Sequence, residues 1–279
     1  GSSRCLAPTA CTIRWSRRRD RRSPLRSDPD IFVRGRRAGP VNSVLSTARV
    51  VRLPALPRRH KYKVLLVLLL VSIVIQTYGL HAGFVGMLSD AFRTVLSVTI
   101  FVVVFRGAGE RVPAAMLLLA TVAIGWARHF TGGSDHDALA LAFNVLSPLF
   151  LWTAVAVILR DLFRTPEAGT GNVLGAICGY LIAADAWTGI NICIFLLAPH
   201  SFAFDPGVQE MLGHWHGRLA LFCYYSFAQM TTLGYSDITP VRAPATTLSL
   251  LVALFGMFYT AIVVSQFVVL AQRASRDSA

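Results

Sequence analysis

Long apolar stretches recur along the chain from residue 64 onward, and charged residues fall mostly between them. About 20 residues of helix, each rising about 1.5 Å, cover the hydrocarbon core of a bilayer, so stretches of this length predict membrane-spanning helices. Six stretches approach that length: 64–80, 92–105, 113–128, 138–159, 172–197 and 246–270. We therefore predict an all-α membrane protein with about six transmembrane helices. A count of five is the alternative, because the second and third stretches are short.

A further apolar stretch is too short to span a bilayer. Leu219–Met230 is apolar and aromatic, lies between the last two long stretches, and continues directly into the sequence TTLGYSDITP at 231–240. A short helix followed by irregular backbone at membrane depth is tolerated only where protein or a water-filled cavity surrounds it. The pattern predicts a re-entrant pore helix and loop over 218–240, within a two-helix pore domain over 170–272.

Residues 231–240 resemble the TTVGYGD signature of potassium channels. The sequences YYSF at 224–227 and GMFYTAIVV at 256–264 extend the resemblance to small bacterial pore-loop channels with four helices ahead of the pore. The likeness covers about residues 170–270, and the first four helices match only in number and spacing. It implies a homotetramer in a bacterial inner membrane that conducts potassium passively and needs no cofactor.

The resemblance also implies which residues form the selectivity filter. A cation that loses its hydration shell needs replacement oxygens, which four chains supply as columns of backbone carbonyls. Glycine suits a backbone with positive φ, and Gly234 fits such a position. The filter residues implied are Thr232, Leu233, Gly234, Tyr235 and Ser236, with K+ held by the carbonyls of the first four and by the Thr232 hydroxyl. The supporting residues implied are Thr231, Asp237, Tyr224 and Tyr225.

Ser236 departs from the family pattern, which has a second glycine at this position. A residue other than glycine at positive φ costs on the order of 1–2 kcal/mol, and each of four subunits would bear this cost. Three interpretations therefore stay open: a potassium-selective pore, which we favour, a less selective pore for monovalent cations, and a non-conducting or regulatory subunit.

The last apolar stretch contains candidate gating residues. Gly256 stands where the family has a glycine hinge, although a small residue there also permits close helix packing. Thr260, Val264 and Phe267 share one helix face at i, i+4 and i+7 spacing. If that face lines the pore, these three side chains form an apolar constriction.

The four helices ahead of the pore, over 64–165, lack the charges of a voltage sensor. Ala138–Leu159 contains no Lys or Arg, and membrane anchoring explains Arg160 and Arg164 at its end. Steep voltage sensing needs about 3–4 moving charges per subunit. We therefore expect conduction that depends little on voltage.

Asp185 is an acidic residue deep within a predicted span, a position that marks a functional hypothesis by default. It either forms a structural hydrogen bond, with Asn191 or a neighbouring helix, or has an ion- or proton-linked role. The second reading leads to a different class of protein: a proton-coupled six-helix secondary transporter with the GYS stretch as a broken-helix binding site.

Composition and charge support the membrane assignment. Hydrophobic residues make up 54% of the 279 residues and charged residues 15%, against about 25% charged in soluble domains. Residues 1–63 carry a net charge of +14 out of a formal +13 for the whole chain, because the remaining residues sum to −1. We predict these residues to be a disordered cytoplasmic tail. Three roles stay open for this tail: a flank that follows the positive-inside rule, a patch that binds anionic membrane lipids, or an arm that binds nucleic acid. The last is the least favoured, so we expect no nucleic-acid partner. An even number of spans then places both termini in the cytoplasm.

Patterns typical of enzymes and metal sites are missing from the sequence. It contains no nucleophile elbow, Walker loop, HExxH motif or paired carboxylates, and its five cysteines show no CxxC spacing. We therefore expect no enzymatic activity. The Asp-His-Asp sequence at 135–137 and the His-Trp-His sequence at 214–216 contain metal-ligand residue types, but we expect both to be solvated loops.

Overall fold

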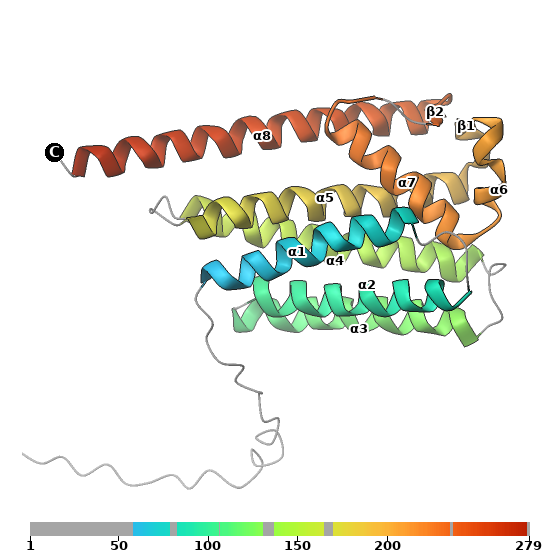
Figure 1. Ribbon diagram of the computed structural model, residues 1–279, viewed down its shortest axis with the longest axis horizontal. Helices are drawn as coiled ribbons and strands as arrows, with labels where there is room; N and C mark the ends of the chain where they lie inside the picture. Colours follow the sequence, from blue (N-terminus) through green and yellow to red (C-terminus); the bar gives the residue numbers. More distant parts are fainter. Residues whose placement is uncertain are drawn as a thin grey trace, which may run out of the picture. The chain divides into compact units, whose positions relative to one another are not determined.

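The computed structural model describes residues 58–78, 83–105, 107–130, 137–164, 170–234 and 237–277. Six long helices account for most of these residues (Figure 1). They are α1 (Arg58–Tyr78), α2 (Gly83–Val104), α3 (Ala108–Phe130), α4 (Asp137–Arg164), α5 (Thr170–Leu197) and α8 (Ala243–Asp277). Each of the six predicted apolar stretches corresponds to one of these helices. The chain is an all-α membrane protein, as predicted.

Five of the six helices are long and apolar enough to cross a membrane, counted over the described residues: α2, α3, α4, α5 and α8. Helix α1 is not among them, and it begins with the basic sequence RRHKYK. Residues 58–63 were predicted to belong to the disordered tail, and this boundary is wrong. The helix extends past the apolar run because Arg and Lys are good helix formers. The rest of the tail, residues 1–57, lies outside the described residues.

Helix α2 begins well before the predicted start at residue 92. Asp90 precedes the predicted stretch and Arg93 lies near its start, and both belong to this helix. The two side chains are accommodated because each has a partner on another helix: Arg93 lies 3.8 Å from Asp185 of α5, and Asp90 lies 3.6 Å from His216. Paired charges of this kind are tolerated within a membrane protein.

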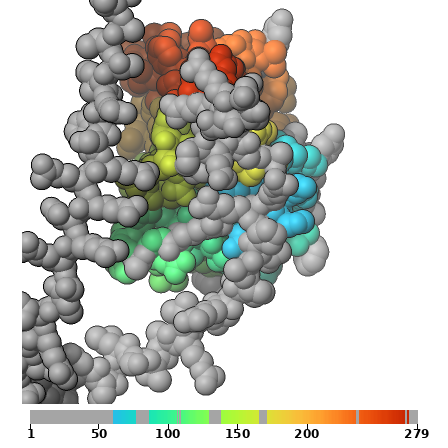
Figure 2. Space-filling model, turned by 90° about the vertical axis from the view of Figure 1, so that its left-hand side faces the viewer, coloured from blue at the N-terminus to red at the C-terminus, as the bar shows by residue number. Residues whose placement is uncertain are grey.

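The main core lies where α5 packs against its neighbours. Helix α5 is apolar on all sides, as expected for a helix enclosed by others, and it contacts α1, α4, α8 and the shorter helix α7 (Trp215–Met230). The longest contact is with α4, where a side chain at Gly189 would overlap the ring of Pro148. The end-on view in Figure 2 shows α8 on one side of this bundle, α4 and α5 in the middle, and α2 and α3 on the other side.

Between α5 and α8 the chain forms several short elements at one end of the bundle (Figure 1). They are η1 (Pro199–Ser201), β1 (Phe202–Phe204), η2 (Pro206–Val208), α6 (Gln209–Leu212), α7 (Trp215–Met230) and β2 (Ile238–Pro240). Strands β1 and β2 pair antiparallel, with Phe202 opposite Pro240 and Phe204 opposite Ile238. This ribbon was not predicted. A second cluster of aromatic side chains packs beneath it, in which the rings of Phe202 and Phe222 lie 5.2 Å apart.

Candidate functional site

Helix α7 ends at the residue that precedes the TTLGYSDITP sequence. It covers Trp215–Met230, so the predicted short helix is present, ends where expected and begins four residues earlier than expected. The last four carbonyls of an α-helix have no hydrogen-bond partner inside the helix, and they carry a partial negative charge. The groups that donate hydrogen bonds to these carbonyls therefore determine the backbone geometry at the start of the candidate filter.

The segment after α7 folds back over the end of the helix. The amide of Thr232 donates to the carbonyl of Gln229 at 3.0 Å, and the amide of Leu233 donates to the carbonyl of Ala228 at 2.9 Å. This pair of bonds is a Schellman motif, in which the first residue past the cap adopts a left-handed conformation. Thr232 occupies that position, with φ of 58°.

Positive φ occurs at two of the described filter residues. Gly234 has φ of 72°, which confirms the prediction for this glycine. Thr232 was not expected to be left-handed, because a β-branched residue is strongly disfavoured there. Its hydroxyl donates to the carbonyl of Thr231 at 2.6 Å and so helps to hold the turn. Tyr235 and Ser236 lie outside the described residues, so their roles stay predictions.

The described filter residues form an open face of the single chain. Thr231, Thr232, Leu233 and Gly234 are all exposed, although the helix before them is largely buried. The Thr231 hydroxyl donates back to the carbonyl of Phe227 at 2.8 Å. The segment is therefore anchored at its base by α7 and uncovered on its outer side.

The predicted supporting residues take different positions. Tyr225 is fully buried and its hydroxyl bonds to Ser249 of α8. Tyr224 points the other way and is 47% exposed. Asp237 is exposed, and its carbonyl accepts a hydrogen bond from the amide of Asp205 at 3.1 Å, at the edge of the ribbon. Of the predicted supports, Tyr225 is the side chain that joins α7 to the next long helix.

Asn191 of α5, one of two candidate partners for Asp185, joins α5 to α7 instead. Its amide nitrogen donates to the hydroxyl of Ser226 at 2.9 Å, and both residues are fully buried. Of the two partners considered for Asp185, Asn191 is therefore not the one observed. A buried amide within an apolar span was the available signal, because such a group requires a polar partner.

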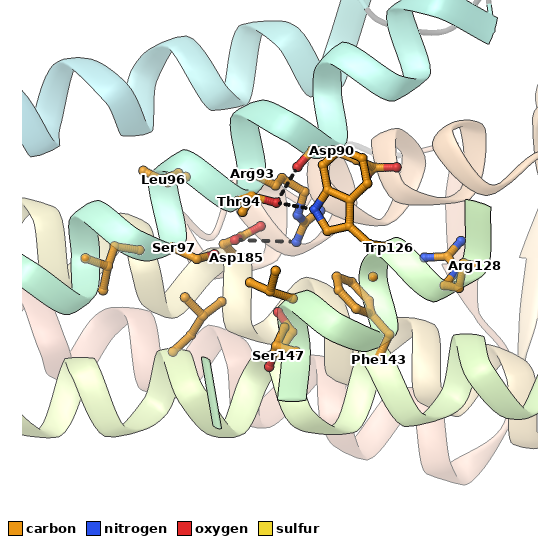
Figure 3. A pocket seen from close by; sticks show the side chains of 15 residues that line it. Asp90, Arg93, Thr94, Leu96, Ser97, Trp126, Arg128, Phe143, Ser147 and Asp185 are labelled. Atoms are coloured by element: carbon orange, nitrogen blue, oxygen red, sulfur yellow. Dashed lines mark hydrogen bonds and ion pairs between the residues drawn. The ribbon is translucent and has the colours of Figure 1, made fainter. Parts of the chain in front are cut away.

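Asp185 lies in a polar pocket between α2, α3, α4 and α5 (Figure 3). Its partner is Arg93 of the neighbouring helix α2, so the expected contact with a neighbouring helix is the one observed. The indole of Trp126 donates to the hydroxyl of Thr94 at 3.2 Å on the same side of the pocket. Arg93 also lies over the ring of Phe143, 5.8 Å from its centre. Asp185 is thus one half of an ion pair within the bundle.

The first residues of α7 pack against the four-helix part of the chain. Trp215 is buried beneath the guanidinium of Arg128, which lies 3.6 Å from the ring centre, a cation–π arrangement. His216 faces Asp90 and fills the space beside Gly86. The prediction of a solvated loop at 214–216 is wrong for these two residues, because they begin α7. Of the other predicted loop, residues 135 and 136 lie outside the described residues, and Asp137 begins α4.

Gly256 is the point where α8 touches the end of α7. A Cβ atom at Gly256 would overlap the carbonyl of Met230, so the small residue permits close packing. Helix α8 continues through this position to Asp277. The hydroxyl of Thr260 donates to the carbonyl of Gly256 at 3.0 Å. The packing interpretation of Gly256 therefore has a structural basis, and its action as a hinge stays a prediction.

The candidate gate residues lie further along α8. Thr260 and Val264 are exposed, and Phe267 is half-buried. Large apolar side chains are also exposed along this helix: Leu250, Leu251, Leu254, Met257, Phe258, Ile262 and Val268. An apolar exposed face on a membrane helix is covered either by lipid or by another protein chain.

Comparison with known proteins supports an ion-conducting role for this part of the chain. Residues 188–273 match a family model described as an ion channel. The match begins in the second half of α5 and includes α7, the filter segment and most of α8. No curated protein matches the chain. The match supports an ion channel and points away from an enzyme.

Proposed function

We propose that four copies of this chain assemble into a potassium-selective channel that conducts ions passively. The observation that carries the proposal is the exposed Thr231–Gly234 segment at the end of α7, within the residues that match an ion-channel family. Carbonyls from a single chain cannot surround a cation, whereas four chains around an axis can. The open faces of the filter segment and of α8 suit contact with neighbouring copies.

The end of α7 favours a cation in this arrangement. A helix C-terminus carries about −0.5 elementary charge, and four such ends would point toward the axis. The carbonyls of Thr232, Leu233, Gly234 and Tyr235 would bind K+, and Ser236 would complete the filter. Thr260, Val264 and Phe267 would line the inner part of the pore as its gate, with Gly256 beside them.

The expected setting is a bacterial inner membrane with both termini in the cytoplasm. The start of α1 and the ends of α4 and α8 lie at the same end of the bundle (Figure 1). Basic residues accompany all three: Lys61 and Lys63, Arg160 and Arg164, and Arg273. Lys and Arg at helix ends favour the cytoplasmic side, and the Arg-rich tail is suited to anionic lipids.

The transporter alternative has less support. A secondary transporter would use Asp185 to carry protons and would show paired interruptions in two helices. Asp185 is ion-paired with Arg93 instead, and the family match covers an ion channel. We therefore favour the channel.

We expect the purified chain to be a tetramer and to show a reversal potential close to the potassium equilibrium potential. Native mass spectrometry in mild detergent measures the first property, and planar bilayers under a potassium/sodium gradient measure the second. A monomer or dimer would contradict the proposed assembly. A tetramer that conducts sodium as well as potassium would retain the channel and favour the less selective pore that Ser236 allows. A tetramer without conductance would favour a regulatory subunit.

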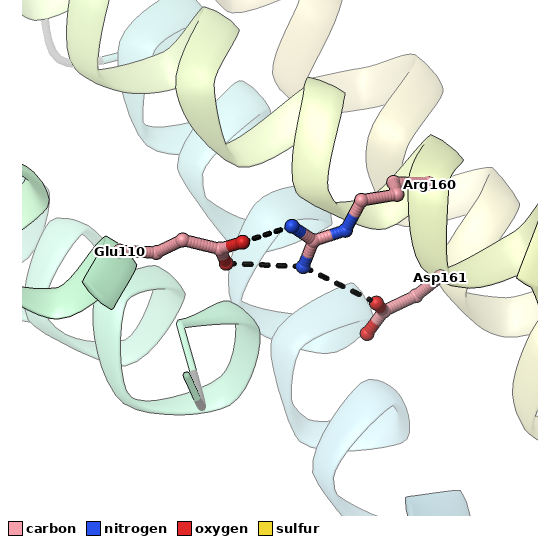
Figure 4. A network of polar contacts seen from close by, with 3 residues as sticks. All are labelled: Glu110, Arg160 and Asp161. Carbon is pink, nitrogen blue, oxygen red and sulfur yellow. Dashed lines mark hydrogen bonds and ion pairs between the residues drawn. The ribbon is translucent and has the colours of Figure 1, made fainter. Parts of the chain in front are cut away.

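We expect the conductance of this channel to depend only weakly on voltage. The helix that would carry the sensor has no Lys or Arg before Arg160, whose guanidinium binds Glu110 of α3 (Figure 4). The same guanidinium lies 3.7 Å from Asp161, so it is held at the helix end. Conductance–voltage curves from patch recordings should show a slope below about one elementary charge, against about 12–16 for four subunits with full sensors. A steep curve would contradict this expectation.

A further inference from the structure

The last carbonyl of α7 receives its hydrogen bond from another helix. The carbonyls of Phe227, Ala228 and Gln229 accept bonds from amides of the four residues that follow the helix. The Met230 carbonyl is the remaining one of the last turn, and it accepts a hydrogen bond from the hydroxyl of Tyr180 on α5 at 3.0 Å. Met230 directly precedes the filter segment, so this bond acts on the peptide group at which that segment begins.

The Met230 carbonyl is enclosed on its other side by α8. Met230 is 1% exposed, and a Cβ at Gly256 would overlap its carbonyl oxygen and carbon. A buried carbonyl of this kind needs a donor, because burial removes the water that would otherwise bind it. Tyr180 supplies the donor, and Gly256 leaves room for the peptide group to reach it.

The ring of Tyr180 is itself held in place. It packs against the ring of Tyr259 of α8, with 5.5 Å between the ring centres. The hydroxyl of Tyr259 donates to the carbonyl of Ala176 at 2.7 Å, one turn before Tyr180 on α5. The two tyrosines thus make the same kind of bond, from a phenol to a backbone carbonyl, but only the bond of Tyr180 ends on α7.

We infer that Tyr180 is a positioning residue for the selectivity filter. Its hydroxyl fixes the orientation of the Met230 peptide group, and this orientation sets the direction in which the chain enters Thr231–Gly234. The inference rests on the proposed function, because a filter is the structure whose carbonyl positions decide which cation binds. Loss of the hydroxyl would leave the ring packing intact and free the peptide group to rotate.

The test compares Tyr180→Phe with Tyr259→Phe in the full chain. Each substitution keeps an aromatic ring and removes one hydroxyl that donates to a backbone carbonyl. We expect Tyr180→Phe to lower the potassium-over-sodium permeability ratio in planar bilayers at least about fivefold, the factor that corresponds to one hydrogen bond. Tyr259→Phe should leave the ratio within about twofold of the unmodified chain, because its bond lies between α8 and α5. Both variants should remain tetrameric by native mass spectrometry.

Three results would overturn the inference. The first is an unchanged permeability ratio in Tyr180→Phe, and the second is an equal decrease in both variants, which would indicate a role in helix packing alone. The third is loss of the tetramer in Tyr180→Phe alone, which would make the hydroxyl a requirement for assembly. If the unmodified chain shows no potassium-selective current, and K+ protects its tetramer from thermal dissociation no better than Na+, the proposed function fails. If instead the unmodified channel is potassium-selective and Tyr180→Phe leaves the permeability ratio unchanged, only the inference about Tyr180 fails.

Discussion

Replacing Gly256 with alanine is expected to destabilise the contact between α8 and α7 by at least about 3 kcal/mol per subunit, the upper part of the range for overpacking. The added Cβ would overlap the carbonyl of Met230 and lie 3.1 Å from the side chain of that residue. The backbone has little freedom to move, because Tyr180 and Gly256 enclose this peptide group. Fluorescence-detected size-exclusion chromatography after graded heating measures the loss of assembled protein.

The matched control is Gly109→Ala in α3, where a Cβ would meet no atom within 4 Å. Alanine is favoured over glycine in a helix by about 1 kcal/mol, so the control should be as stable as the unmodified chain or more stable. The higher helix propensity of alanine would also stabilise Gly256→Ala. A decrease in stability of that variant would therefore have to come from the overlap with Met230. Normal assembly with altered opening in Gly256→Ala would instead support the hinge.

Neutralising either member of the Arg93–Asp185 pair is expected to destabilise the fold by about 3 kcal/mol, the lower limit for breaking a buried ion pair. The two side chains are 16% and 15% exposed, so a remaining single charge would stay mostly desolvated within the bundle. The double variant with Arg93→Gln and Asp185→Asn should lose much less free energy of unfolding than the two single variants lose in sum. Denaturant unfolding of the four proteins of this double-mutant cycle measures the coupling free energy.

The pair Glu110 and Arg160 serves as the control cycle. These side chains are 31% and 39% exposed at the end of the bundle, and exposed pairs contribute about 1 kcal/mol or less. The coupling should therefore be larger for Arg93 with Asp185 than for Glu110 with Arg160. Additive effects of Arg93→Gln and Asp185→Asn would show that the pair contributes nothing to stability. The ion- or proton-linked role of Asp185 would then be the favoured alternative.

The helices were predictable because hydropathy is a property of each stretch by itself. The start of α2 was not, since Asp90 interrupts the apolar pattern before residue 92 and has its partner, His216, on another helix. The partner of Arg93, Asp185, is also on another helix. Both partners lie far along the chain. The same limit applies to the tail boundary, where α1 extends into the basic residues without any change in composition to mark its start.

At the candidate site, the resemblance to a known motif identified the segment and the positive φ of Gly234. It named Thr232 but did not predict its left-handed conformation, because that conformation depends on the backbone bonds that Thr232 and the following residues make to α7. It also missed Tyr180, since a tyrosine that donates to a backbone carbonyl leaves no residue pattern in the sequence. For Gly256, the sequence offered a hinge or close packing, and the position of the Met230 carbonyl supports the second.

The β1–β2 ribbon has a consequence for how the chain can vary in length. By pairing Phe202 with Pro240, it ties together the two ends of the segment that contains α7 and the candidate filter. Residues added between β1 and α7 would enlarge a loop whose ends are already fixed, and each doubling of loop length costs only about 0.6 kcal/mol. The chain from Asp205 to His214 is therefore a place where related sequences can differ in length, while the two strands that frame the candidate filter stay paired.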